Sequence, residues 1–586
     1  MSNRKPLALK PFCEALEQHC RTLSYEELVE LVLALGAQVR PGERHAFLEQ
    51  IGSLVDLAAL GVDPGSLAAK AESLVQELHT RWEAISDGSY WELYADEESE
   101  ESGRYYRDSF DVPAITEAHW ETLLELFAEA EALVVDGRLE DARRAYEPLI
   151  SLFRRENENP FAPSASADRQ KLELREARAR YARCVYETAP LESRLEHTLW
   201  ALEATARHPF AELALSGDYP TFTEMADARR TELPDRETFL QSWRQRLREE
   251  TGGSARAQAL FLEAVELTEG EPGLQRVARE WWPSRPLAYR YWIEYLRNRE
   301  RRQDAVNAAR EVLRPEHAGL TDGPLDPLAA RDHRRVRTYA AETLVNIGRQ
   351  LQDDEIVLEG RRTLFQFRRS DRSLAELLQA AEPLGRREIE LQQAIDILGA
   401  GEERRTATHV KALMIAGRLG ETFSIARSGK SVGWSHSDGA TGLCFAAILA
   451  HSNGGAVPST PVIERLLVEY AEPDEEADRP DGYLVQAIVE GLTQASLDQE
   501  TAASYLRWAE KVARARVDHV VSKKHRGAYR RAAETLVALG EHYAVTARPD
   551  SAATLIQEYR DRFNRHTAFK RELREVLSQS ALADTI

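Results

Sequence analysis

The sequence is poor in cysteine: 586 residues contain only Cys13, Cys20, Cys184 and Cys444. So few thiols form no disulfide framework, which suits a reducing compartment. None of them belongs to a Cys-x-x-Cys pair, and this argues against a structural zinc site of the ordinary kind. We therefore expect neither a metal nor another cofactor.

Long apolar runs are missing as well. The longest one, Leu443–Ala450, has eight residues, whereas a membrane-spanning helix needs roughly twenty. The opening MSNRKPLALKPF contains no apolar core of signal-peptide length. Apolar residues at 43% and charged residues at 30% are typical of a soluble globular protein. We expect a cytoplasmic protein with no membrane partner.

Acidic residues outnumber basic ones over the whole chain, but basic residues are concentrated near one end. The net charge of −21 argues against nucleic acid as the main partner, because phosphate binding needs clustered cations. Residues 506–575, however, hold sixteen Lys or Arg and nine Asp or Glu, a net of +7. This segment could contact nucleic acid, an acidic partner or the acidic body of its own chain. The last alternative is the common one for such a segment.

No alternating strand pattern is found, and helical periodicity runs through the whole chain. Helix starts are marked by the capping box Ser24–Glu27, by a similar signal at Ser496–Gln499, and by Pro461 at a first helical position. The sequence therefore predicts an all-α fold.

Two acidic stretches predict linkers or loops. Between Glu92 and Glu101 there are six acidic and no basic residues, and EPDEEADRPDG follows at 472–482. Together with the Gly/Ser-rich run at 427–442, these breaks predict five segments. They are an N-terminal helical domain at 1–86, an acidic linker at 87–115, a helical array at 116–426, a hinge loop at 427–442 and a smaller, relatively basic helical domain at 443–586.

One turn recurs between predicted helices. Gly137-Arg138-Leu139-Glu140-Asp141-Ala142 separates WETLLELFAEAEALVVD from ARRAYEPLISLF. Similar turns precede Ala305, Thr422 and Ala552, at intervals of 163, 117 and 130 residues. There is thus no strict repeat period, but each hairpin needs a neighbour to bury its apolar face. We predict degenerate helical hairpins stacked into an α-solenoid.

The turn at Gly137 resembles the centre of a tetratricopeptide repeat, where a small residue ends one helix and alanine lets the next pack closely. In that resemblance the facing apolar positions are Leu126, Ala130, Leu133, Tyr146 and Leu149. The runs HRGAYRRAAETLVALGEHYA and RPDSAATLIQEYRDRFNRHTAFKRELREVL are similar to the helical region that accompanies SWIM zinc fingers in uncharacterised bacterial proteins. This chain lacks the Cys-x-Cys and Cys-x-His pairs of that finger, so the resemblance implies only a tetratricopeptide-like interaction scaffold.

The stretch GKSVGWSHSDGATG at 429–442 brings Ser435, His436 and Asp438 close together in sequence. A nucleophile elbow needs a second glycine where Ser437 stands, and catalytic triads draw their members from separate segments. A phosphate-binding loop would need glycine at 424, which is Ser. A metal site would need His436, Cys444 and His451, but Cys444 and His451 lie seven residues apart on one predicted helix. At 1.5 Å rise per residue they are about 10 Å apart along the axis, which is too far for one zinc ion. We predict no catalytic residue, and a hinge or protease-sensitive loop whose candidate residues are Arg427, Ser428, Gly429, Lys430, Trp434, Ser435, His436 and Asp438.

Aromatic and basic clusters are the candidate interaction surface. The aromatic cluster has helical spacing and predicts inter-helix core or a peptide-binding groove, while the arginines around LFQF and the basic run after 522 predict solvated faces or contacts with an acidic partner. The candidate residues are Trp281, Trp282, Tyr291, Trp292, Arg361, Arg362, Arg368, Arg369, Lys523, Lys524, Arg526, Arg530 and Arg531.

Three functions stay open on the sequence. The favoured one is a non-enzymatic scaffold that binds a protein or peptide in a helical-repeat groove. The second is a regulatory partner or proteolytic substrate in a bacterial defence assembly with a caspase-like protease, cleaved at 427–440 to release the C-terminal unit. The third is an unrecognised enzyme or a nucleic-acid binder acting through the basic C-terminal region.

Overall fold

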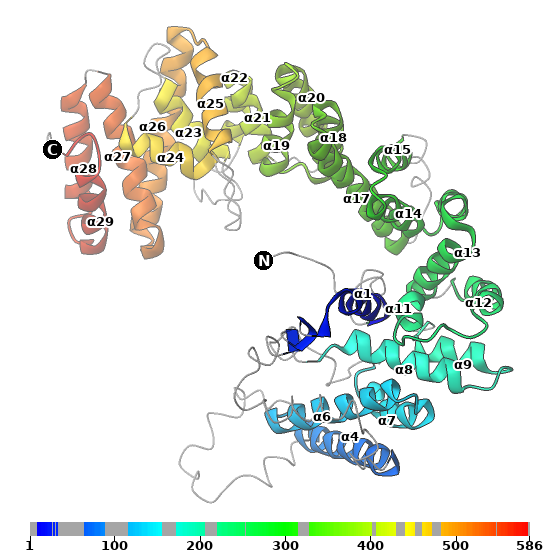
Figure 1. The fold of residues 1–586 in the computed structure, drawn as a ribbon. Coiled ribbons are helices and arrows are strands. Elements are labelled where there is room, and N and C mark those ends of the chain that lie inside the picture. Colours follow the sequence, from blue (N-terminus) through cyan, green and yellow to red (C-terminus); the bar gives the residue numbers. More distant parts are fainter. Residues whose placement is uncertain are drawn as a thin grey trace, which may run out of the picture. The chain divides into compact units, whose positions relative to one another are not determined.

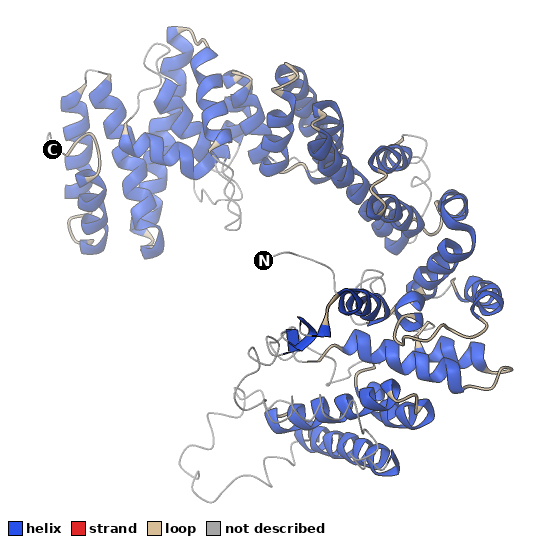
Figure 2. Cartoon of the chain, in the orientation of Figure 1, coloured by secondary structure: helices blue, strands red, loops and turns tan. Residues whose placement is uncertain are grey.

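The computed structural model describes residues 9–25, 27–29, 31–32, 64–87, 115–154, 172–204, 219–251, 254–314, 327–400, 406–428, 440–451, 460–471, 482–546 and 548–583. Every regular element in these ranges is a helix, and none is a strand (Figure 2). The predicted all-α class is therefore confirmed. The chain divides into two compact units, Met1–Arg279 and Glu280–Ile586.

In the first unit, each helix from α4 to α12 packs against a helix one or two places away in sequence (Figure 1). The helices of this unit are α1 (Leu9–Thr22), α4 (Pro64–Asp87), α6 (Glu117–Val135), α7 (Leu139–Leu152), α8 (Leu174–Thr188), α9 (Arg194–Ala201), α11 (Phe222–Ala226), α12 (Arg236–Glu250) and α13 (Ala255–Trp281), which ends just inside the second unit. Helix α4 packs against α6 and α7 with Leu67, Leu74 and Leu78 buried. The predicted 1–86 domain is thus joined to the array rather than separate from it.

The second unit is also built of helices, most of which pack against the next helix in sequence (Figure 1). Its elements are α14 (Leu287–Asn298), α15 (Arg302–Leu313), α17 (Pro327–Leu351), α18 (Asp354–Arg368), α19 (Asp371–Ala381), α20 (Arg387–Ala400), α21 (Thr406–Ile415), α22 (Leu419–Ser428), α23 (Ala440–His451), α24 (Pro461–Ala471), α25 (Tyr483–Gln494), α26 (Gln499–Ser522), the 3₁₀ turn η6 (Arg526–Ala528), α27 (Tyr529–Val545), α28 (Pro549–Arg562) and α29 (Thr567–Ser578).

The predicted helix starts are largely as expected. Ser24 and Glu27 exchange hydrogen bonds as a capping box, and α24 begins at Pro461. At the start of α26, however, Asp498 caps the helix by accepting the N–H of Thr501 at 2.9 Å, so Ser496 is not the cap as predicted. A carboxylate is the better acceptor because it also complements the helix dipole.

The recurrent turn has one backbone geometry. In three of these turns the second residue after the first helix is left-handed: Gly137 at φ 78°, Glu300 at φ 57° and Gly417 at φ 69°. The next N–H then bonds to a carbonyl five residues back, at 2.8–3.0 Å. These bonds satisfy the last carbonyls of the first helix, so the second helix can start at once. The hairpins predicted from the sequence are therefore real structural units.

The side chains of these turns also repeat. An arginine donates to an acidic residue three positions later, at 3.1 Å from Arg138, 2.8 Å from Arg301 and 2.5 Å from Arg418. The acidic partners are Asp141, Asp304 and Glu421. The position that follows each acid is fully buried, and so is the equivalent residue of the fourth turn: Ala142, Ala305, Thr422 and Ala552. Small residues there let paired helices approach closely, as predicted.

Gln352 occupies the same left-handed position between α17 and α18, at φ 56°. Because glycine adopts this conformation without steric cost, Gln352→Gly is expected to stabilise the protein by about 0.5–1 kcal/mol. Gln350→Gly, two residues earlier inside α17, is expected to destabilise it by about 1 kcal/mol. Urea denaturation measures both, and a Gln352→Gly variant no more stable than Gln350→Gly would contradict the assigned turn.

The core of the second unit crosses the predicted hinge. Buried apolar residues form one cluster from Leu358 to Leu582, and α23 lies within it with all twelve residues buried. Helix α23 packs against α21 and α22 before the 427–442 segment and against α24, α26 and α27 after it. The division into compact units falls between Arg279 and Glu280 instead. The domain border predicted at 427–442 is corrected accordingly: the flanking helices share one interior.

Three histidines of this unit, His333, His451 and His542, are buried, and burial lowers the pKa of each below its ordinary value. The unfolded chain therefore binds protons more readily than the folded one as the pH falls through about 6.5. We expect the free energy of unfolding to decrease between pH 7.5 and 5.5, by about 1.4 kcal/mol for each unit of pKa difference. Urea denaturation across this range, with His542→Gln for comparison, tests it. Equal pH slopes for both proteins would contradict the assignment.

Candidate interaction surface

The aromatic cluster lies in the core of the second unit. Trp282 meets Tyr289 and His333 edge to face at 5.2 and 4.7 Å between ring centroids, and Tyr289 lies 5.8 Å from Trp292. Trp281, Trp282 and Trp292 are at most 5% exposed, while Tyr291 is half-buried. The three indoles therefore fill the space between helices. Their prediction as interaction-surface residues is corrected to inter-helix core.

The arginines of α18 are held by acidic residues of neighbouring helices. Arg361 pairs with Glu376 of α19, Arg362 makes two hydrogen bonds to the buried Glu390 of α20, and Arg368 pairs with Glu342 of α17. Arg369 is the left-handed C-cap of α18 and donates to the carbonyl of Gln366. These ion pairs tie four helices together. The arginines thus hold neighbouring helices together, and Arg361 also lines a cavity.

That cavity has a volume of about 460 Å³ and lies among α17, α18 and α19. Its wall combines two guanidinium groups, two amides, two carboxylates and small apolar surfaces: Gly348, Arg349, Gln352, Asp354, Val357, Arg361, Glu376, Gln379, Ala380 and Pro383. Burial lowers the pKa of Arg361, with Arg349 and Arg372 adding repulsion and Glu376 opposing it. Such a wall can bind the polar backbone and side chains of an extended peptide.

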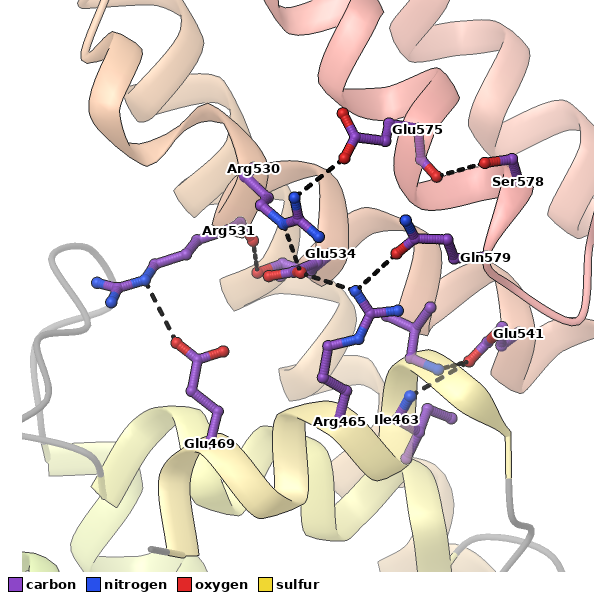
Figure 3. A network of polar contacts seen from close by, with 12 residues as sticks. Ile463, Arg465, Glu469, Arg530, Arg531, Glu534, Glu541, Glu575, Ser578 and Gln579 are labelled. Carbon is purple, nitrogen blue, oxygen red and sulfur yellow. Dashed lines mark hydrogen bonds and ion pairs between the residues drawn. The ribbon is translucent and has the colours of Figure 1, made fainter. Parts of the chain in front are cut away.

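The basic C-terminal region is partly neutralised by the chain itself (Figure 3). Arg530 pairs with Glu534 and with Glu575 of α29, and Arg531 pairs with Glu469 of α24. Burial raises the pKa of Glu534, and Arg465 opposes that shift from α24 at 3.2 Å. For Arg530 and Arg531, contact with acidic residues of the same chain is thus the observed arrangement.

The turn between α26 and α27 differs. Lys523, Lys524 and Arg526 are exposed there, and Lys524 is left-handed at φ 59°. In the described part of the chain, no acidic residue lies within ion-pair distance of these three side chains. Of the predicted basic candidates, these are the ones available to a partner.

Most of the predicted hinge loop lies outside the described residues, namely Gly429, Lys430, Trp434, Ser435, His436 and Asp438. Arg427 is exposed in the last turn of α22, which ends at Ser428. Cys444 is 1% exposed in α23 and burial raises its pKa to about 12, so it packs as a small apolar residue. Among the described residues, no group of three His, Cys, Asp or Glu side chains is placed to hold a metal ion. No described helix is both long and apolar enough to cross a membrane.

Cleavage within 429–439 is expected to leave the two fragments associated, because α21 and α22 share one core with α23 and α25. An inserted protease site there makes the measurement possible. After complete cutting, the fragments should co-elute in gel filtration and separate only in denaturant. Fragments that separate in native buffer would contradict the continuous core and favour release of a C-terminal unit.

No protein-family model matches the chain, and no curated protein matches it. Among solved structures, one similarity is to a circular tandem repeat protein with novel repeat topology and enhanced subunit contact surfaces. It has 15% identity, covers 88% of this chain and 96% of that chain, and has a TM-score of 0.17. At that TM-score the backbones do not superpose, so the fold rests on this chain's own hairpins. Those hairpins define an all-α helical-repeat protein of the α-solenoid class.

Sequence reasoning missed several residues that the structure brings together. Arg349 and Glu376 join Arg361 at the cavity, and the ion pair of Arg562 with Asp518 brings the end of α28 beside the last turns of α26. A signal for the second pair was present in the run RDRFNRHTAFKR at 560–571, which has five basic residues and one acidic residue. No local signal marks the cavity, since its walls come from three helices.

Proposed function

We propose that the chain is a non-enzymatic interaction scaffold whose second unit binds an extended segment of a partner protein at the cavity among α17, α18 and α19. The observation that carries this proposal is the cavity itself: about 460 Å³, open to solvent, and lined by paired charges rather than by a nucleophile and a base. Stacked hairpins commonly present such surfaces to partners.

The chemistry of the wall suggests how a peptide would bind. Gln352 and Gln379 offer amide donors and acceptors to a peptide backbone, while Arg349 and Arg361 offer guanidinium forks to a carboxylate. Val357, Ala380 and Pro383 supply apolar contact. Because Arg361 already pairs with Glu376, an acidic ligand would have to share that guanidinium or bind Arg349.

The remaining expectations belong to the same proposal. The scaffold is tetratricopeptide-like in its turns, bacterial, and located in the cytoplasm. A role as a partner in a defence assembly is compatible with it. Cleavage at 427–440 is not favoured as a release mechanism, because the helices on both sides share one core.

A matched pair of alanine substitutions tests the proposal. Ala380→Trp fills the cavity from α19, and Ala553→Trp places the same bulk in a shallower, more open hollow along α28; both alanines are half-buried. With the full chain as bait in host extract, we expect wild type and Ala553→Trp to retain a common partner that Ala380→Trp loses at least tenfold. Equal capture by all three baits, with equal melting temperatures, would overturn the site.

A further inference from the structure

Two basic segments far apart in sequence meet at one end of the C-terminal hairpins. Asp518 in the last turns of α26 pairs with Arg562 at the end of α28, at 3.0 Å. Tyr529 at the start of α27 meets Phe569 at the start of α29, with ring centroids 5.9 Å apart. We call residues 519–531 and 560–571 the basic end. Its two segments are held together by contacts, not by sequence proximity.

The basic end is the most cationic part of an acidic chain. Its two segments contain ten Lys or Arg and a single acidic residue, Asp561, whereas the whole chain has a net charge of −21. Some of these cations form ion pairs with acidic residues of the same chain, namely Glu469, Asp518, Glu534, Glu572 and Glu575. Within the described ranges, Lys523, Lys524, Arg526 and Arg565 are exposed and have no acidic side chain at ion-pair distance. They form a surface that attracts anions.

The surface offers charge without apolar anchors. Its aromatic residues Tyr529, Phe563 and Phe569 are at most 5% exposed, since they pack beneath the turns. Protein interfaces draw most of their binding energy from buried aromatic and apolar anchors, and this end presents none among its described residues. A phosphate backbone needs no such anchor, because released counterions drive its binding.

We propose that the basic end binds the phosphate backbone of duplex nucleic acid without reading its sequence. Lys523, Lys524, Arg526 and Arg565 contact phosphates, and the acidic remainder of the chain repels the nucleic acid, so binding is confined to this end. This goes beyond the scaffold function and does not depend on the cavity among α17, α18 and α19.

The test uses the full chain and a fluorescent 30-base-pair duplex, with anisotropy measured from 50 to 200 mM salt. The first variant reverses Lys523, Lys524 and Arg526 to Glu. The control reverses three exposed cations elsewhere, Lys70, Arg144 and Arg334, and so changes the net charge equally. We expect Kd at 50 mM salt to rise about 30-fold or more for the first variant and less than about threefold for the control. The slope of log K against log salt should fall by up to about 3 for the first variant only.

Three results would overturn the proposal. One is the absence of duplex binding by the wild type at 50 mM salt, and another is an equal loss in both variants. The third is tighter binding of a labelled poly-glutamate peptide than of the duplex, which would assign the basic end to an acidic protein partner. Circular dichroism melting of both variants checks that the fold is intact, and we expect melting temperatures equal to that of the wild type.

Discussion

Replacing Gly491 by alanine is expected to destabilise the second unit by about 3 kcal/mol or more. A Cβ at this position in α25 would lie 2.5 Å from the carbonyl oxygen of Ile415, and closer still to that of Met414, both at the end of α21. These are backbone atoms, so no side-chain rotation relieves the overlap and the two helices must move apart. Urea denaturation of the full chain measures the loss.

Gly527→Ala is the matched control for this substitution. Gly527 lies in the exposed turn before α27, and an added Cβ meets no atom within 4 Å. We expect its effect to stay within about 0.5 kcal/mol, as for ordinary surface positions. If Gly491→Ala were as mild as Gly527→Ala, the close crossing of α21 and α25 would be refuted. That crossing joins helices from the two sides of the 427–442 segment.

Glu541→Ala is expected to cost about 3–5 kcal/mol. The Glu541 carboxylate is fully buried in α27 and accepts the N–H groups of Val462 and Ile463 at 3.1 and 3.2 Å and that of Ala581 at 2.9 Å (Figure 3 labels Glu541 and Ile463). It thereby caps α24 and fixes the segment after α29. Without the Glu541 carboxylate, these buried N–H groups have no acceptor, and the folded state is destabilised by the full free energy of their desolvation.

An exposed glutamate provides the comparison for Glu541. Glu558 pairs with Arg514 at 2.8 Å on the surface of α28, and Glu558→Ala is expected to cost less than about 1 kcal/mol. Hydrogen exchange should show faster exchange of the Val462, Ile463 and Ala581 amides in Glu541→Ala alone. Unchanged exchange at these amides would show that Glu541 does not cap them.

The hairpins could be predicted from the sequence because their determinants are local. A left-handed residue, an arginine with its acidic partner three positions on, and a small buried residue all fall within six positions, as at Gly137–Ala142. The buried face of the first hairpin followed from the same register, with Leu126, Ala130, Leu133, Tyr146 and Leu149 all at most 3% exposed.

The surface could not be predicted equally well, because its determinants are distant in sequence. Arg361 and Arg362 pair with carboxylates that lie 15 and 28 residues later in the sequence. Arg465 pairs with Glu534, at a sequence separation of 69 residues. The glycine-rich break at 427–442 predicted a domain border, but a border depends on which interiors are shared, and Leu443–Ala450 fills the interior common to both sides. Tryptophan spacing likewise identifies a helix face without telling whether another helix covers it.

The most direct test of the scaffold function is site-specific photo-crosslinking at two exposed glutamines. Gln379 lines the cavity among α17, α18 and α19, and Gln557 lines the shallower, more open hollow along α28. With a photoreactive amino acid at either position of the full chain in its host, we expect a discrete protein adduct from Gln379 and none from Gln557, and Ala380→Trp should abolish that adduct. No adduct at Gln379, or the same adduct from both positions, would contradict a partner-binding cavity.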